Sequence, residues 1–144
     1  MAQAGMFVPC SSFHYKPYNA IYTRILGNDN IFKGLSTFTV EMSEVSTFIN
    51  TCDENSLILG DEVCSGTETS SAVSIFASVL LWLNKKKSSH IFASHFHQLT
   101  TMKEIVSLKS LAIKHMSVKN IGGELHYTRK LEDGPGVNMY GIEV

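Results

Sequence analysis

The chain has 144 residues, 44% hydrophobic and 17% charged, which is the composition of one ordinary globular domain. Its formal net charge of −1 argues against a surface built mainly to grip nucleic acid, and no apolar run approaches the roughly 20 residues of a membrane span. The first residues lack the basic and apolar regions of a signal peptide. Three cysteines without Cys-x-x-Cys spacing predict reduced thiols in an intracellular protein.

The first third of the chain predicts two strands and a helix. GMFVP (residues 5–9) and NAIYTRIL (residues 19–26) are rich in β-branched and aromatic residues, which is typical of short strands, and GNDN (residues 27–30) predicts a turn. Between residues 38 and 51, apolar side chains recur at helical spacing. Glu41 and Glu44 fall off that apolar face, so we expect both glutamates to lie outside the core.

The remainder alternates strands with helices. SLILGDEV (residues 56–63) and SHIFASHF (residues 89–96) predict buried strands, and QLTTMKEIVSL (residues 98–108) predicts a short helix. A longer helix between the two strands carries one apolar stripe, formed by Ala72, Ile75, Phe76, Val79, Leu80 and Leu83. Alternating runs around Gly-Gly predict a β-hairpin over residues 113–131. The expected fold is α/β, with a mostly parallel sheet flanked by helices and an antiparallel hairpin near the C-terminus.

Two acids, Asp61 and Glu62, end the first of these buried strands, and His95 lies at the end of the next. Ligands of open α/β sheets bind at the carboxyl ends of strands, and a right-handed crossover brings these two ends to the same edge. The pattern fits phosphoryl transfer, in which Asp61 holds Mg²⁺ and Glu62 orients or deprotonates the attacking water. The alternative is that the acids only begin a loop and cap the following helix from Thr67.

Other histidines raise a zinc alternative at this edge. His90 and His97 lie near His95 in the sequence. However, His95 and His97 are two residues apart, which places them on one strand face, and no third ligand lies close in sequence. The sequence therefore disfavours metal binding by the histidines, and a purely structural role at the strand end is the alternative interpretation of His95.

A third feature precedes the first helix. Gly34 comes just before it, and Ser36 and Thr37 occupy its first turn. Free N–H groups, the positive end of the helix dipole and two hydroxyls suit an anion. Plain N-capping by Ser36 or Thr37 is the alternative interpretation.

Taken in order, these features resemble the ATPase domain of the MutS family of DNA mismatch-repair proteins. The resemblance rests on FVPC, TRILGNDNIFKGLSTFTVEMSEV, LILGDEVCSGTET and IFASHFHQLT, and it runs along nearly the whole chain. Its most specific parts are G-x-STF-x-VEM at residues 34–42 and DE-x-x-x-GT at residues 61–67. The stretch FASHF resembles the family's F-A-T-H-[YF], with Ser94 in place of threonine.

The resemblance implies an ABC-type P-loop NTPase fold that binds ATP and Mg²⁺ and works as a dimer. By this resemblance, Asp61 is the Walker B acid that supports Mg²⁺ and Glu62 is the residue that activates water. His95 is the switch histidine that senses the γ-phosphate. These are the expected metal and catalytic residues.

The resemblance also implies a composite nucleotide site. Gly34, Ser36 and Thr37 occupy the signature position, which in this family reaches the nucleotide held by the partner subunit. Gly66 and Thr67 belong to the loop after Walker B, which runs along the dimer interface. The implied partners are a second MutS-type subunit and mismatched double-stranded DNA, the latter through domains absent from this chain.

One departure from the family limits what the chain is expected to do alone. No G-x₄-G-K-[ST] phosphate loop occurs in the 144 residues. We therefore expect residues 1–144 to form a partial MutS-type ATPase domain, without the Walker A region and the C-terminal dimerisation helices, that is inactive alone. Two alternatives stay open: another ABC-type ATPase of DNA repair or chromosome maintenance, and an inactive interaction domain.

Overall fold

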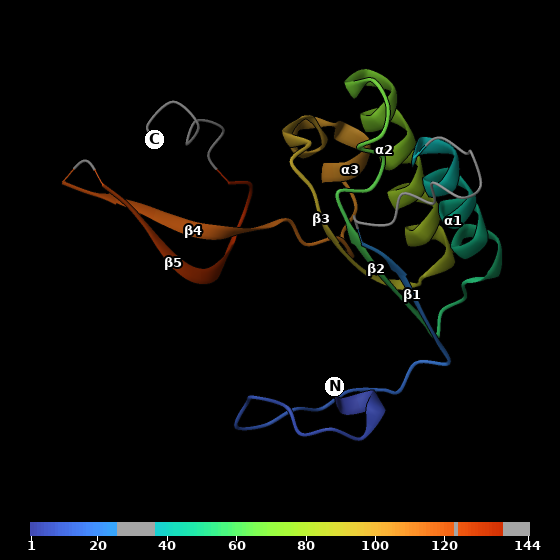
Figure 1. Cartoon of the computed structure of the whole chain (residues 1–144), viewed down its shortest axis with the longest axis horizontal. Helices are drawn as coiled ribbons and strands as arrows, with labels where there is room; N and C mark the ends of the chain where they lie inside the picture. Colours follow the sequence, from blue (N-terminus) through green and yellow to red (C-terminus); the bar gives the residue numbers. More distant parts are fainter. Residues whose placement is uncertain (26–36, 123, 137–144) are drawn as a thin grey trace. The chain divides into compact units, whose positions relative to one another are not determined.

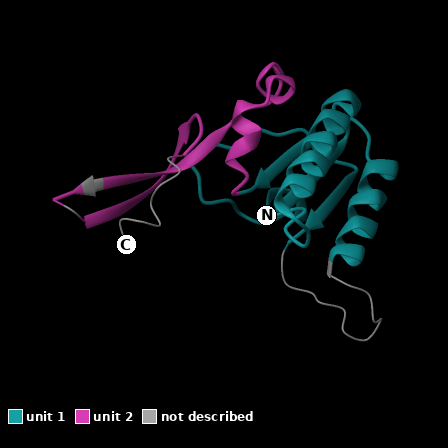
Figure 2. Cartoon of the chain, turned by 90° about the horizontal axis from the view of Figure 1, so that it is seen from above, with its two compact units in different colours: residues 1–94 teal, residues 95–144 magenta. Residues whose placement is uncertain are grey.

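The computed structural model describes residues 1–25, 37–122 and 124–136 (Figure 1), and the chain divides into two compact units. Unit 1 runs from Met1 to Ser94 and unit 2 from His95 to Val144 (Figure 2). Unit 1 holds a parallel sheet and two long helices, whereas unit 2 holds short helices and a hairpin. The fold is therefore α/β with an antiparallel element in the second unit, as the sequence predicted.

The sheet of unit 1 has three parallel strands in the order β1–β2–β3. They are β1 (Ala20–Arg24), β2 (Ser56–Asp61) and β3 (Ser89–Ala93). Helix α1 (Thr37–Thr51) lies between the first two strands in sequence, and α2 (Thr69–Lys86) lies between the second two. Parallel neighbours require a crossover connection, and an amphipathic helix supplies each one. The predicted parallel sheet is confirmed.

Both long helices pack on the same face of this sheet. Arg24, Gly60 and Phe92 are register partners across the three strands, so they share one face. On that face Arg24 contacts Glu41 of α1, and the ring of Phe92 meets the ring of Phe76 of α2 edge-on at 5.2 Å. Figure 1 shows α1 and α2 lying side by side. The helices that were predicted to flank the sheet therefore both cover one face.

The hydrophobic core of unit 1 lies between that face and the two helices. Its main apolar side chains are Val45, Phe48, Ile58, Val63, Phe76, Val79, Leu80 and Leu83, all buried. The opposite face is more open, because Ile21 is 47% exposed and Ile91 is 68% exposed. The apolar stripe predicted for the second helix is confirmed as the side of α2 that enters the core, except that Ile75 is only half-buried and Val73 and Ala77 are buried as well.

A residue other than the two acids caps the start of α2. Its N-cap is Glu68, whose carboxylate accepts hydrogen bonds from the backbone N–H groups of Ser70 and Ser71. These bonds satisfy donors that the first helical turn leaves unpaired. Asp61 and Glu62 therefore do not cap α2, and the alternative interpretation of the acid pair as a helix cap is wrong.

Unit 2 contains two short helical segments and the hairpin. The segments are η3 (His97–Thr101) and α3 (Lys103–Val106), and the hairpin consists of β4 (Lys114–Ile121) and β5 (Glu124–Asp133). The strands pair antiparallel with an irregularity between Met116 and Val118. The predicted hairpin around Gly-Gly is thus confirmed.

Three sequence predictions about the strands and helices need correction. Residues 6–8 form no strand, and Phe7 is 98% exposed. A strand is stable only within a ladder, and among the described residues no other strand pairs with this segment. Residues 89–96 form a shorter strand, and β3 has no fully buried residue because it is the outer member of the described sheet. The helix predicted over residues 98–108 is divided into η3 and α3. The turn predicted at residues 27–30 lies outside the described residues.

Candidate functional site

The acid pair stands at the carboxyl end of the central strand. Asp61 is the last residue of β2 and is the register partner of Ala93, the last residue of β3. Alternation along β2 places Asp61 on the face opposite the helices, where its side chain is exposed. The sequence therefore located the acids correctly at an edge where strands end together, and Asp61 is accessible to a ligand.

The backbone that follows Asp61 has an unusual conformation. Glu62 has a φ of 48° and Cys64 a φ of 71°, in the left-handed region that residues other than glycine rarely adopt. Such conformations cost of order 1–3 kcal/mol each and persist only where the surroundings impose them. Here the N–H of Glu62 donates to the carbonyl of Ala93 at 3.0 Å, and the side chain of Val63 is fully buried. The sheet and the core thus set the direction of the Glu62 side chain.

Gly60, the residue before the acids in β2, leaves room for a side chain of the neighbouring strand β3. A Cβ atom at this position would lie 2.3 Å from Cδ1 of Phe92 and 2.8 Å from Cγ2 of Val63. Only a residue without a side chain fits there. The ring of Phe92 therefore occupies the space that a side chain at position 60 would need.

The loop after the acids lies directly against the start of α1. A Cβ atom at Gly66 would be 3.3 Å from both the Cα and the backbone nitrogen of Phe38, a tight contact that would need a shift of a few tenths of an ångström between the loop and the helix. Thr37 is the first residue of α1, and Thr67 is half-buried in the loop. The structure therefore brings two sequence-predicted segments together, the loop of Gly66 and Thr67 and the helix start at Thr37. Gly34 and Ser36 lie outside the described residues.

His95 is the first residue of unit 2, and its ring is 4.8 Å from the ring of Phe96. Its predicted meeting with the acids at one sheet edge stays a prediction. His90 has its own partner, because Nδ1 lies 3.1 Å from the carbonyl oxygen of Ser88. Within the described ranges, no group of three or more His, Cys, Asp and Glu side chains is arranged to hold a metal ion.

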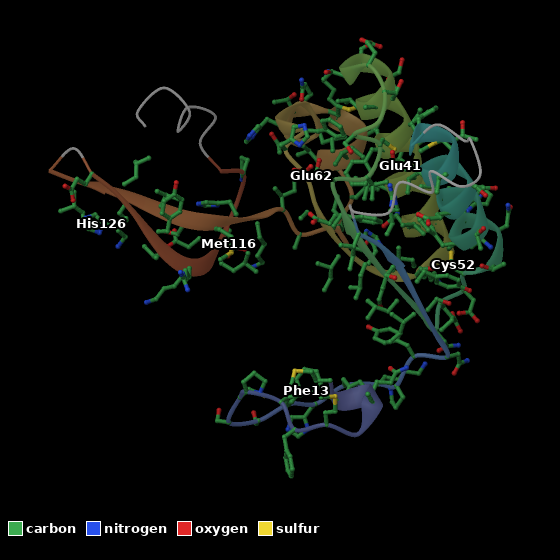
Figure 3. The ribbon with its side chains drawn as sticks, in the orientation of Figure 1. Phe13, Glu41, Cys52, Glu62, Met116 and His126 are labelled. Atoms are coloured by element: carbon green, nitrogen blue, oxygen red, sulfur yellow. The ribbon has the colours of Figure 1, made fainter. Side chains whose placement is uncertain are left out.

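Glu41 was expected outside the core, and this prediction is wrong. Its side chain is only 1% exposed, and its Oε1 atom accepts a hydrogen bond from the N–H of Cys64 at 2.6 Å. Figure 3 labels the side chains of Glu41 and Glu62. The same oxygen lies 3.8 Å from Nε of Arg24, which is 6% exposed. Burying a carboxylate is costly unless it is paired. The cation and the amide are the partners of Oε1, whereas Oε2 of Glu41 and Nε of Arg24 have no hydrogen-bond partner within the described residues. The one signal in the sequence was an arginine inside the apolar run IYTRIL.

Cys64 adjoins this carboxylate. Burial, and then the charge of Glu41, raise the pKa of the Cys64 thiol to about 11. A thiol with so high a pKa carries almost no thiolate at neutral pH and is a poor nucleophile. Cys64 therefore serves the loop as a small buried side chain, and the chemistry of the site belongs to the carboxylates.

The donors at the edge of the sheet fit a hard divalent cation. An exposed carboxylate such as that of Asp61 is the oxygen ligand that Mg²⁺ prefers, and Mg²⁺ in proteins is usually held by one or two carboxylates together with phosphates and water. Glu62, one residue on, adds a second carboxylate on a fixed backbone. The residue types at this strand end are therefore those from which a Mg²⁺ site is built.

Comparison with known proteins gives a consistent result. A family model described as MutS domain V matches residues 1–144. A DNA mismatch repair protein mutS homolog of Acanthamoeba polyphaga mimivirus and a mitochondrial DNA mismatch repair protein mutS homolog of Sarcophyton glaucum are each 42% identical to the chain. The DNA mismatch repair protein MutS of Petrotoga mobilis is 41% identical.

These similarities cover 100% of this chain but only a small part of each relative. The chain spans 13% of the mimivirus protein, 14% of the Sarcophyton protein and 18% of the Petrotoga protein. No helix in the described part of the chain is long and apolar enough to cross a membrane.

Proposed function

The chain belongs to the MutS family of DNA mismatch-repair proteins, and from this premise we propose that it forms part of a domain that binds and hydrolyses ATP. In this proposal the domain has an ABC-type P-loop fold and works as a dimer with a second MutS-type subunit. It couples ATP to the binding of mismatched double-stranded DNA, which is contacted by regions outside these residues. The observation that carries the proposal is the pair Asp61–Glu62 at the carboxyl end of the central parallel strand.

Each acid has a distinct role in the proposed reaction. Asp61 holds Mg²⁺, directly or through water, because its carboxylate is exposed at the strand end. When bound, the ion neutralises charge on the phosphates. Glu62 orients the attacking water and accepts its proton, and the hydrogen bond of its N–H to Ala93 fixes the backbone from which this side chain projects. His95 senses the γ-phosphate.

The start of α1 serves a nucleotide bound by the partner subunit. Gly34, Ser36 and Thr37 form this signature segment, and the loop of Gly66 and Thr67 lies at the dimer interface. The close approach of Gly66 to α1 supports this part of the proposal, because a movement of the start of α1 would displace the loop that follows the acids.

The 144 residues contain no G-x₄-G-K-[ST] sequence, so the chain alone lacks the lysine and amides that cradle the β- and γ-phosphates. We therefore test the proposal in a chimera. Residues 1–144 replace the matching segment of Petrotoga mobilis MutS, which is 41% identical over this region. The chimera, its Glu62→Gln variant and the isolated chain are compared for Mg-ATP binding and steady-state hydrolysis.

We expect the chimera to hydrolyse ATP and the isolated chain to show no turnover above background. Glu62→Gln should keep ATP binding but lower the turnover rate by roughly 10² to 10⁴, the usual cost of removing a positioned general base. Glu54→Gln is the matched control, because Glu54 is exposed in the turn before β2, at the other end of that strand. A folded chimera without ATPase activity, or a Glu62→Gln variant within about threefold of its parent, contradicts the proposal.

A further inference from the structure

None of the roles proposed so far uses the buried carboxylate of Glu41. It lies in the second turn of α1, 1% exposed, and faces Arg24 at the end of β1 and the loop that follows β2. A carboxylate in such a place costs more than an apolar side chain unless it is fully partnered. Any benefit of this buried carboxylate must therefore act through the groups that it contacts.

One of these contacts holds the backbone beside the proposed catalytic base. The N–H of Cys64 donates to Oε1 of Glu41 at 2.6 Å, a length typical of a strong bond to a charged acceptor. Cys64 and Glu62 are the two residues of this loop with positive φ, and only Val63 separates them. The hydrogen bond to Glu41 is therefore made two residues after Glu62. It holds the short stretch of backbone from which the Glu62 side chain projects.

Among the hydrogen bonds that the structure describes in this loop, two come from other parts of unit 1 and one lies within the loop. The N–H of Glu62 donates to the carbonyl of Ala93, the N–H of Ser65 donates to the carbonyl of Glu62 at 3.2 Å, and the N–H of Cys64 donates to Glu41. The first two join backbone atoms, so no substitution removes them selectively. The third depends on a side chain, and it ties the loop to the helix that begins at Thr37.

We propose that Glu41 is a positioning residue, whose hydrogen bond to the Cys64 amide holds Glu62 in the orientation needed to activate water. The inference rests on the proposed function for its catalytic part. Glu41 touches no reacting group and acts through the loop. The length and acceptor of its side chain matter, whereas the contact with Arg24 offsets part of the cost of burying its charge.

Four variants separate these properties. Glu41→Ala removes the acceptor, Glu41→Asp keeps the charge but is one methylene too short, and Glu41→Gln keeps the length and an acceptor oxygen without the charge. Glu44→Gln is the matched control, because Oε2 of Glu44 also contacts Nε of Arg24, at 3.3 Å, yet Glu44 is 47% exposed and makes no contact with Cys64 that the structure describes.

The first measurement uses the 144-residue chain and does not depend on ATP. The Cys64 amide proton is followed by NMR through its chemical shift and its exchange with solvent. In the parent, Glu41→Gln and Glu44→Gln proteins it should be shifted downfield and protected from exchange. In Glu41→Ala and Glu41→Asp the shift should move upfield and exchange should become at least about tenfold faster, since an amide without its acceptor loses that protection.

The second measurement is steady-state ATP hydrolysis by the chimera carrying the same variants. Because a misplacement of about 1 Å can cost roughly 100-fold, we expect Glu41→Ala and Glu41→Asp to lower kcat by about 10- to 100-fold with KM within about twofold. Glu41→Gln and Glu44→Gln should stay within about threefold of the parent. If Glu41→Ala does not fold, the comparison of Glu41→Asp with Glu41→Gln decides.

The two measurements distinguish failure of the inference from failure of the proposed function. An unchanged Cys64 amide in Glu41→Asp and Glu41→Ala overturns the inference. So does a displaced amide with unchanged kcat, or a Glu41→Gln variant that loses activity as fully as Glu41→Asp. A folded chimera without ATPase activity overturns the proposed function and, with it, the catalytic part of the inference, while the amide signal still shows whether Glu41 holds the loop.

Discussion

Replacing Gly60 by alanine tests the packing that stands directly before the acid pair. The added Cβ would lie 2.3 Å from Cδ1 and 2.4 Å from Cε1 of Phe92, and 2.8 Å from Cγ2 of Val63. Carbon atoms in contact are normally about 3.5–4.0 Å apart, so the ring must move by more than about 1 Å. Its edge-on contact with Phe76, which is buried in α2, opposes movement toward the helix.

The size of the effect follows from two opposing terms. Overpacking of this kind typically costs about 1–3 kcal/mol, whereas replacing glycine by alanine within a strand recovers about 0.5–1 kcal/mol through the unfolded chain. The two ranges combine to a net loss between about 0 and 2.5 kcal/mol, and because two groups clash with the added Cβ we expect Gly60→Ala to lower the free energy of unfolding by an amount in the upper half of that range. The measurement is urea unfolding followed by the fluorescence of Trp82, the only tryptophan, which lies on α2 of unit 1.

A second substitution shows whether the ring is the cause. In a Phe92→Ala background most of the clash is gone, so Gly60→Ala should cost less than about half as much, and the difference is the coupling energy of the two positions. The slope of the denaturant dependence should be the same for all four proteins. A Gly60→Ala protein at least as stable as its parent, or an equal cost in both backgrounds, refutes this account of the packing.

Two further predictions concern pH. Because the pKa of the buried Cys64 thiol is raised from 9.0 to about 11, the unfolded chain ionises first, and the free energy of unfolding should fall between these pH values by up to roughly 2 kcal/mol. The free energy of unfolding of Cys64→Ala, measured by urea unfolding, should not show this fall. An equal fall in both proteins contradicts the prediction. Hydrogen bonds from the side chain and backbone of Ser70, and then those of Ser71, lower the pKa of Glu68 from 4.5 to about 2, so its stabilisation of α2 is present above 4.5 and is lost as the pH falls toward 2. The difference in Tm between the parent and Glu68→Gln should therefore shrink on acidification, and a constant difference argues against this role of the cap.

Local patterns in the sequence were enough to predict most of the fold. The alternation of apolar strands with an amphipathic helix predicted a parallel sheet, and the Gly-Gly pair between alternating runs predicted the hairpin, because each of these signals acts over a few neighbouring residues. The place of Asp61 and Glu62 at the end of a buried strand was visible for the same reason. A strand needs a partner as well as a pattern, however, and for that reason the strand predicted at residues 5–9 does not form.

The orientation of the site depended on contacts between distant segments. Glu41 looked like a solvent-facing glutamate on its own helix, but its partners are Arg24, on β1, and the Cys64 amide, 23 residues further along the chain. Likewise, the positive φ of Glu62 has no signal in the sequence, since it results from Ala93 on one side and the buried Val63 on the other. The sequence determined which acids stand at the strand end. The tertiary structure decided the backbone conformation that follows them, because the groups that hold this backbone come from β3 and α1, which are distant in the sequence.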